Sequence, residues 1–268
     1  MGAIGHVVAR ALDERVAVVP VDRTRAPLRA EEAPVDVAVV TTKTPGTEWA
    51  ANVAGKILAP DGVAITIQNG LGNYETLAEH VGHDRAAVGV IYVGAQLVDG
   101  KLQATGPGKV ELGRPTSPAS RARLDDLASL LSIGGMDVTV VDDPWPSVWR
   151  KVVTNAAVNP VTALMRKTNA DLLADSAASL VADTLAREVA RVATAYGVVI
   201  EEDEAVRQWR RMAELTGANR SSMLQDVEAG RPTEIDAICG AVAREGQRRR
   251  VPAPTNAAMT LLVSALQQ

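Results

Sequence analysis

Residues 35–42 read VDVAVVTT, and this stretch decides the fold of the first half of the chain. Short runs that are almost continuously apolar are typical of strands buried on both faces of a parallel sheet. Three further β-rich runs lie at 15–21, 63–68 and 87–94. Helical patterns separate these runs near 5–13, 46–57 and 73–81. The alternation of strands with helices predicts a doubly wound α/β domain.

The end of this half is predicted to complete the α/β domain. We expect a β-hairpin over 101–113, in which Gly106-Pro107-Gly108 forms the turn. A helix is expected near 118–131 and a last strand over 137–141. Two prolines in Asp143-Pro144-Trp145-Pro146 resist regular structure, so this segment predicts a hinge between two domains.

The second half of the chain is predicted to be entirely helical. Candidate helices cover 146–165, 169–196, 201–216, 219–228, 232–249 and 253–267. We therefore expect an α/β domain over residues 1–143, followed by an all-helical domain over residues 144–268.

Composition narrows the classes of function. The 268 residues are 47% apolar and 22% charged, which is typical of a globular protein with two domains. A net charge of −4 argues against a nucleic-acid partner. The single cysteine, Cys239, excludes an intrachain disulfide and a cysteine-based metal site. No metal site is predicted from the three histidines either, because they do not cluster with carboxylates.

The same composition predicts a cytoplasmic protein. A lone cysteine is typical of the reducing cytosol. No apolar run approaches the roughly 20 residues of a membrane span, and we see no signal peptide, so no membrane partner is expected.

The strongest functional signal is a polar stripe on an apolar helix. Residues 149–162 read WRKVVTNAAVNPVT. As a helix, this segment places Lys151, Asn155 and Asn159 at i, i+4 and i+8, on one face. The valines and alanines between them belong in a packed interior. Two interpretations remain open, namely the polar wall of a buried site and a solvated stripe on a surface helix.

A glycine motif at the start of the chain indicates cofactor binding. Residues 1–5 read MGAIG and lead into a helical pattern. They resemble the second half of a Gly-x-Gly-x-x-Gly turn, whose glycines let the backbone approach a pyrophosphate at a helix N-terminus. The candidate contacts are Gly2, Ala3, Ile4 and Gly5. An unstructured start followed by a helix explains the pattern equally well.

A charged segment follows at the position of the ribose contact. Seventeen residues after Gly5 the chain reads DRTR, near the expected spacing of about 20. An acidic residue favours an unphosphorylated ribose, whereas arginines favour a 2′-phosphate. Arg23 and Arg25 outweigh Asp22, so the sequence favours NADP(H). The alternative is a charged surface turn.

Polar residues also follow two predicted parallel strands. Thr41-Thr42-Lys43-Thr44 ends one strand, and Gln68-Asn69-Gly70 ends the next. The ligand crevice of an open α/β sheet lies at the carboxyl ends of its strands. Asn69 can donate and accept hydrogen bonds, and Gly70 permits a close approach of backbone. A simple turn is the alternative interpretation of Asn69-Gly70.

Two polar motifs begin helices in the second half. Residues 219–226 read NRSSMLQD, with serines placed to cap a helix. Residues 232–236 read PTEID, in which Glu234 and Asp236 suit the positive end of a helix dipole. Each motif therefore has a structural explanation when it is taken singly.

Taken in order, these motifs resemble the ketopantoate reductase family, also called the 2-dehydropantoate 2-reductases. The motifs are GAIG, TK, QNG, WRK-x3-N-x3-NP-x-TA, SSMLQD and TEID, and they extend over essentially the whole chain. The resemblance implies an N-terminal Rossmann domain and a helical C-terminal domain. It also implies reduction of 2-dehydropantoate to pantoate by NADPH, on the route to pantothenate and coenzyme A.

The resemblance assigns roles to individual residues. It implies that Lys151 is the general acid that protonates the substrate carbonyl oxygen. Glu234 is implied near the same substrate, either pairing with Lys151 or holding a substrate hydroxyl. The implied substrate-binding residues are Asn155, Asn159, Asn169, Asn219 and Ser222. The implied cofactor-binding residues are Gly2, Ala3, Ile4, Gly5, Arg23, Arg25, Lys43 and Asn69, with Asn69 at the junction of nicotinamide and substrate.

General chemistry agrees with these roles. Reduction of a 2-oxo acid places negative charge on the carbonyl oxygen, so a nearby cation is needed in the transition state. A lysine ammonium can supply both the charge and a proton. No covalent intermediate is needed, so the reaction requires no nucleophilic Cys/His or Ser/His pair.

Two departures from the family pattern matter. The chain starts inside the glycine turn, so the first strand of the sheet is missing, which leaves a strand edge open. We expect either that the true start lies upstream or that a truncation has removed cofactor binding. In addition, the segment between Arg25 and Pro34 is shorter than in the family, which puts the cofactor preference in doubt.

Two other functions remain open. The chain could reduce another branched 2-oxo acid on the same fold, or it could be a non-catalytic remnant that binds partners through its helical domain. The protein could also form a homodimer.

Overall fold

The structure is a computed structural model, and it describes residues 2–12, 15–22, 34–98 and 101–267. The chain divides into two compact units. The first contains Met1–Gln68 and Asn73–Pro144, and the second contains Asn69–Gly72 and Trp145–Gln268. The short loop Asn69–Gly72 therefore belongs to the second unit, although its neighbours in sequence belong to the first.

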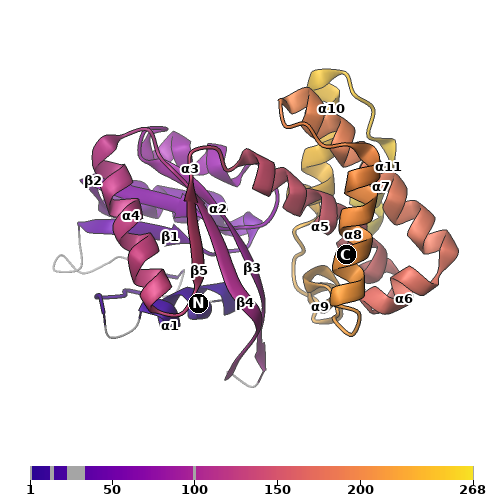
Figure 1. The fold of residues 1–268 in the computed structure, drawn as a ribbon, viewed down its shortest axis with the longest axis horizontal. Helices are drawn as coiled ribbons and strands as arrows, with labels where there is room; N and C mark the ends of the chain where they lie inside the picture. The colour runs from indigo at the N-terminus through magenta and orange to yellow at the C-terminus, as the bar shows by residue number, and fades with distance from the viewer. Residues whose placement is uncertain (1, 13–14, 23–33, 99–100, 268) are drawn as a thin grey trace. The chain divides into compact units, whose positions relative to one another are not determined.

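The first unit is built on a five-stranded mixed sheet (Figure 1). Its strands are β1 (Val35–Val40), β2 (Leu58–Thr66), β3 (Ala86–Val98), β4 (Lys101–Gly113) and β5 (Asp137–Val141). They lie in the order β1-β2-β3-β4-β5. The strands β1, β2 and β3 are parallel, β4 is antiparallel to β3, and β5 is parallel to β4.

Helices cover both faces of this sheet. The helices α1 (Ala3–Leu12) and α4 (Pro118–Ile133) share a core with one face, and α2 (Thr47–Ile57) and α3 (Asn73–Val81) share a core with the other. Successive side chains of a strand point to opposite faces. Accordingly, Ile65 of β2 packs with α1 and α4, whereas Ala64 packs with α2 and α3. This two-sided burial explains why the strands are almost continuously apolar.

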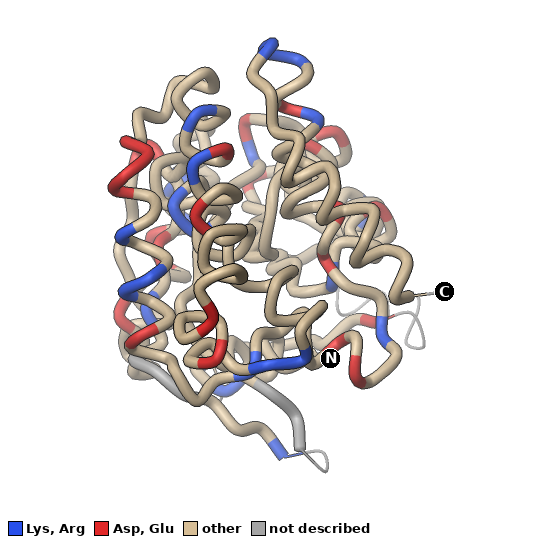
Figure 2. The backbone as a smooth tube through the Cα atoms, turned by 90° about the vertical axis from the view of Figure 1, so that its right-hand side faces the viewer, with Lys and Arg blue, Asp and Glu red and all other residues tan. Residues whose placement is uncertain are grey.

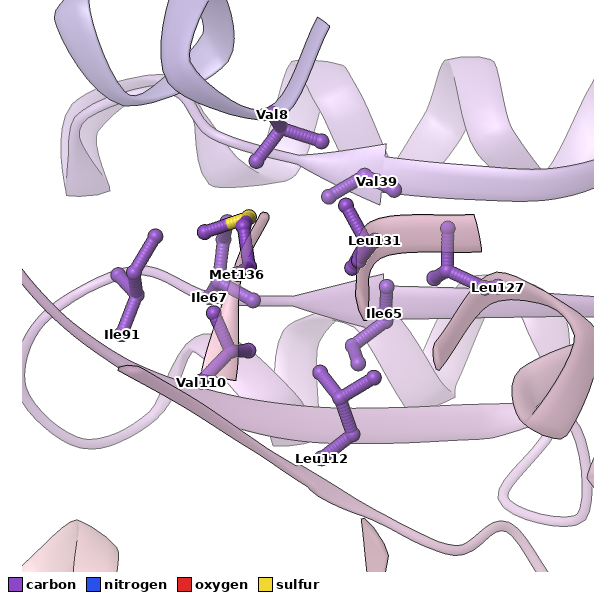
Figure 3. A pocket seen from close by; sticks show the side chains of 10 residues that line it. All are labelled: Val8, Val39, Ile65, Ile67, Ile91, Val110, Leu112, Leu127, Leu131 and Met136. Atoms are coloured by element: carbon purple, nitrogen blue, oxygen red, sulfur yellow. The ribbon is translucent and has the colours of Figure 1, made fainter. Parts of the chain in front are cut away.

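Apolar side chains fill the space between α1, α4 and the sheet. They leave only a small cavity, whose lining includes Val8 of α1, Leu127 and Leu131 of α4, and Ile65 of β2 (Figure 3). The lining carries no polar side chain, so this cavity is a packing gap in the core.

Two sequence predictions in this unit were wrong. The predicted strand at 15–21 is not a strand: residues 17–21 have no regular structure, and Val16 and Val18 are exposed. Their β-propensity is not enough without a neighbouring strand to pair with. The predicted turn at Gly106-Pro107-Gly108 lies within β4, and the hairpin joins β3 to β4 instead. Pairing jumps there from Tyr92–Lys109 to Gly94–Thr105, so the segment makes an irregularity in the ladder.

The second unit is helical. Its elements are α5 (Trp145–Met165), α6 (Asn169–Ala174), α7 (Ser176–Tyr196), α8 (Glu202–Leu215), α9 (Ser222–Glu228), the π-helical turn η3 (Asp236–Gly240), α10 (Ala241–Arg249) and α11 (Pro254–Ala265). The predicted helix at 169–196 is two helices, because the Asp175 side chain accepts hydrogen bonds from two backbone N–H groups and caps α7. The predicted helix at 232–249 begins later and opens with η3.

The helix α5 forms the centre of this unit. It packs against α7, α8, α9 and α11. Its Trp149 is completely buried and lies beside Tyr196, with ring centroids 5.4 Å apart. A sheet of mainly parallel strands between helices, followed by a helical domain, is a Rossmann-type α/β architecture, which confirms the predicted fold class.

Charges are mixed along the helices. Figure 2 shows basic and acidic segments interspersed on the same helices, and Arg187–Asp203 and Arg191–Glu202 pair α7 with the start of α8. Among the described residues, no helix is both long enough and apolar enough to span a membrane.

Candidate active site

The polar stripe on α5 lies in a packed environment. Of residues 148–163, only Arg150 is exposed. Asn159 is 7% exposed, and Lys151 and Asn155 are partly buried. The interpretation of this segment as a solvated surface helix was therefore wrong, because nearly all of the helix surface around the stripe is covered.

Burial changes the acidity of Lys151. Removal of the ammonium from water lowers its pKa from 10.5 to about 8, although the negative charge of Glu234 acts in the opposite direction. A lysine with this pKa can give up a proton near neutral pH, which an ordinary surface lysine does much less readily.

Glu234 lies in the same unit and is also buried. Its side chain is 8% exposed and accepts a hydrogen bond of 3.0 Å from Asn69 Nδ2. The preceding residue, Thr233, is held by Gln267, which accepts from the Thr233 N–H and donates to its Oγ1. The structure therefore brings together Lys151, Glu234 and Asn69, which are far apart in sequence.

The structure places three of the predicted substrate residues, Asn169, Asn219 and Ser222, in different environments. Asn169 is buried and donates through Nδ2 to Thr216 Oγ1, at 2.9 Å. Its N–H donates to the Asn219 carbonyl, at 3.1 Å. The Asn169 Oδ1 atom is buried and has no hydrogen-bond partner among the described residues. Asn219 and Ser222 have exposed side chains.

A buried contact between Thr162 and Ser221 was not predicted. Ser221 caps α9 by accepting from the Leu224 N–H, and its Oγ lies 2.7 Å from Thr162 Oγ1. The serine pair at 221–222 predicted a cap, but no local pattern indicates which helix the cap meets. This contact fixes the start of α9, and with it Ser222, against α5.

On the first unit, the start of α1 fits an anion. The helix begins at Ala3, its first turn carries no acidic residue, and a Cβ atom on Gly2 would meet nothing within 4 Å. The N–H groups of a first helical turn have no acceptor within the helix and lie at the positive end of its dipole. Gly2, Ala3, Ile4 and Gly5 could therefore hold a pyrophosphate.

The carboxyl ends of β1 and β2 carry a polar network that sequence reasoning missed. Gln68 Nε2 donates to the Thr42 carbonyl and to Thr47 Oγ1, at 2.8 Å in each case. Thr47 Oγ1 in turn donates to Asn73 Oδ1, at 2.8 Å. These bonds fix the loops that follow both strands, including the exposed Lys43.

The predicted 2′-phosphate contacts, Arg23 and Arg25, lie outside the described residues. Within the described part of the chain, no group of three or more His, Cys, Asp or Glu side chains could hold a metal ion.

Two protein-family models match the chain. The model described as ketopantoate reductase PanE/ApbA matches residues 5–117, and its C-terminal counterpart matches residues 145–267. The 2-dehydropantoate 2-reductase of Halobacterium salinarum is 35% identical over 237 residues, which cover 88% of this chain and 77% of that protein. That of Archaeoglobus fulgidus is 34% identical, over 87% of this chain and 76% of that protein.

Solved structures agree with these matches. The 2-dehydropantoate 2-reductase of Geobacter metallireducens is similar with a TM-score of 0.84 and 26% identity, over 99% of this chain and 97% of that one. A D-mandelate dehydrogenase in complex with NADH and anilino(oxo)acetate is similar with a TM-score of 0.82 and 26% identity, over 89% of this chain and 78% of that one.

The low pKa of Lys151 predicts a pH-dependent cost in stability. Below pH 8 the lysine is protonated in both the folded and unfolded states, so folding bears the full cost of burying the charge. This cost disappears as the pH rises from about 8 to 10.5, because the folded state releases its proton first. At about 1.4 kcal/mol per pKa unit, Lys151→Met should raise the free energy of unfolding at pH 7 by roughly 1–3 kcal/mol.

Urea denaturation of both proteins across this pH range measures the effect. The advantage of Lys151→Met should shrink steadily as the pH rises, whereas the exposed control Lys167→Met should show no such trend. The free energies of unfolding of Lys151→Met and the wild type could instead differ by the same amount at every pH. That result would contradict a pKa of Lys151 that is lower in the folded state than in the unfolded state.

Proposed function

Because this chain belongs to the ketopantoate reductase family, we propose that it reduces 2-dehydropantoate to pantoate with NADPH. The observation that carries this proposal is the group formed by the buried Glu234 with the partly buried Lys151 and Asn69, on the same unit as the amides of α5. A cation of low pKa among hydrogen-bonding side chains suits a small, oxygen-rich 2-oxo acid.

Each residue of this group has a chemical task in the reduction. When bound, a reduced nicotinamide supplies the hydride that reaches C2 of the substrate. The Lys151 ammonium stabilises the charge that develops on the carbonyl oxygen and then donates a proton from Nζ to it. Glu234 stabilises the protonated form of Lys151 and can also accept a hydrogen bond from a substrate hydroxyl. Asn155 and Asn159 bind the remaining substrate oxygens.

The α/β unit has the groups that a dinucleotide requires. The first turn of α1 supplies backbone N–H groups for the pyrophosphate. Lys43 follows the carboxyl end of β1, and Gln68 follows that of β2, which is the edge where such sheets bind ligands. For the 2′-phosphate we propose Arg23 and Arg25. A homodimer and a cytoplasmic location remain predictions from the sequence.

A second substrate class has a specific observation in its favour. The D-mandelate dehydrogenase with a similar structure is described with anilino(oxo)acetate, which carries an oxo group beside a carboxylate. A reductase of another branched or aromatic 2-oxo acid would keep Lys151 and the asparagines of α5. The residues at 219–236 would then select a different side chain.

Substrate comparison tests the proposed function. We expect kcat/KM for 2-dehydropantoate to exceed that for 2-oxo-2-phenylacetate and for branched 2-oxo acids by roughly tenfold or more, which corresponds to about 1.4 kcal/mol. Equal or faster turnover of another acid would assign the chain to the second class. Failure of both NADPH and NADH to bind saturably in a fluorescence titration would refute the reductase function for this chain.

The pH dependence of the reaction tests the role of Lys151. Because the protonated lysine is the active form, kcat/KM should be constant below pH 8 and fall about tenfold per pH unit above it. Lys151→Ala should lower kcat by roughly 100-fold or more with little change in the Kd of NADPH. The exposed Lys167→Ala serves as the control. Similar losses in kcat and in cofactor affinity would argue against proton donation.

The cofactor preference tests the arginine pair. Charge-assisted hydrogen bonds contribute about 1.5–3 kcal/mol each, so Arg23→Ala combined with Arg25→Ala should raise the Kd of NADPH by tenfold or more. The Kd of NADH should stay nearly the same, and Arg10→Ala, which removes an exposed arginine of α1, should change neither. An unchanged preference would place the 2′-phosphate contacts elsewhere.

A further inference from the structure

A π-helical turn follows Glu234 almost directly. π-Helical turns are rare, occur mostly as single turns within α-helices and are frequent at functional sites. In η3 the Ala241 N–H donates to the Ile238 carbonyl, whereas an uninterrupted α-helix would direct it to the carbonyl of Ala237. The Ala241 N–H, the usual α-helical donor to the Ala237 carbonyl, is therefore directed to another acceptor.

That carbonyl binds the loop Asn69–Gly72. The Leu71 N–H donates to Ala237 O, at 2.8 Å. Gly70 has a φ of +86°, and a Cβ atom on it would lie 2.3 Å from Ala237 O and 2.9 Å from Ala237 Cβ. The loop thus lies directly against the turn, at a distance that only glycine permits.

The same loop holds the carboxylate of Glu234. Asn69, which is adjacent to Gly70, donates to Glu234 Oε2 at 3.0 Å. The Glu234 carbonyl accepts from the Ile238 N–H, at 3.1 Å, so its backbone is tied to the turn as well. Glu234 is therefore fixed at both ends, at its backbone by η3 and at its carboxylate by the loop that rests on η3.

An ion pair supports the turn from outside. Arg244 donates to both carboxylate oxygens of Asp236, at 2.6 and 3.2 Å, and to the Asp236 carbonyl, at 3.0 Å. Both side chains are half-exposed or more. Because exposed ion pairs contribute little to stability, we assign the main effect to the contact between Gly70 and Ala237.

We propose that Gly70 is a positioning residue, which docks the Asn69 loop on the π-helical turn and so fixes the Glu234 carboxylate near Lys151. The inference rests on the proposed roles of Lys151 and Glu234 in the reduction. The negative charge of Glu234 raises the pKa of Lys151 against the effect of burial. Displacement of its carboxylate weakens a stabilising negative charge, while the effect of burial stays the same. The pKa of Lys151 then falls below its value in the wild type.

Two glycines of the loop give a matched test. Gly70 and Gly72 have φ values of +86° and +90°, so alanine strains the backbone similarly at both positions. A Cβ atom on Gly72 meets nothing within 4 Å, however, so only Gly70→Ala disturbs the contact with Ala237. The pKa of Lys151 is measured by NMR titration of protein labelled with ¹³Cε-lysine, in which Lys151→Arg identifies the signal.

In Gly70→Ala the pKa of Lys151 should fall by about half a unit or more, and the descending limb of the kcat/KM profile should move to lower pH by the same amount. The value of kcat should fall roughly fivefold or more, because the ammonium is less populated and less well placed. Gly72→Ala should leave the pKa and the profile as in the wild type. An unchanged or raised pKa in Gly70→Ala, or an equal fall in Gly72→Ala, would overturn the inference.

A second variant decides the matter if Gly70→Ala does not fold. Asn69→Ala removes the side chain that donates to Glu234, at a partly exposed position. The pKa of Lys151 should fall in this variant, as it should in Gly70→Ala. An unchanged pKa in Asn69→Ala would overturn the inference. The titration needs no turnover, so a wild type that reduces no 2-oxo acid would refute the proposed function, while the pKa values would still decide the role of Gly70.

Discussion

The candidate site depends on the burial of one positive charge. Lys151 lies on the central helix of the helical unit, where desolvation lowers its pKa to about 8. Water would stabilise the ammonium better than this environment does, so the unit bears a cost at neutral pH. The same burial gives the lysine a pKa that suits the proposed proton donation. The burial that suits Lys151 to the proposed catalysis therefore lowers the stability of the fold. Titratable groups with strongly shifted pKa values are common at functional sites.

Several separate segments converge on this charge. The helix α5 supplies Lys151 and the two asparagines, the segment before η3 supplies Glu234, and the loop Asn69–Gly72 supplies the donor to Glu234. The helix α9 is fixed to α5 through Ser221 and Thr162. Since α5 is packed on most of its surface, its polar side chains are held in place by the surrounding core. A rigid helix that carries the proposed proton donor would lower the cost of orientation in the transition state.

The sequence predicts the architecture well where burial follows a simple period. The apolar runs at 35–42 and 63–68 contain β1 and the end of β2, because both faces of the sheet are covered. The run at 15–21 has similar composition but forms no strand, since a strand also needs a partner. The turn predicted at Gly106-Pro107-Gly108 was wrong because glycine and proline also occur at ladder irregularities, and residue type alone does not distinguish the two.

The sequence predicts the part of the candidate site that lies on one helix, because helix spacing is periodic. The spacing of Lys151, Asn155 and Asn159 indicates one helix face, and the structure has all three on α5. Contacts between distant segments leave no such periodic signal. The bond from Asn69 to Glu234 spans 165 residues, and the π-helical turn that supports it has no local pattern in the sequence. The assigned roles in substrate and cofactor binding stay predictions.

The decisive measurement is the pKa of Lys151 itself. It can be read from an NMR titration of ¹³Cε-lysine in the wild type and in Glu234→Gln, with no substrate or cofactor present. We expect a value of about 8 in the wild type and a lower value when the charge of Glu234 is removed. A wild-type value near the ordinary 10.5, or a value that does not respond to Glu234→Gln, would contradict this expectation.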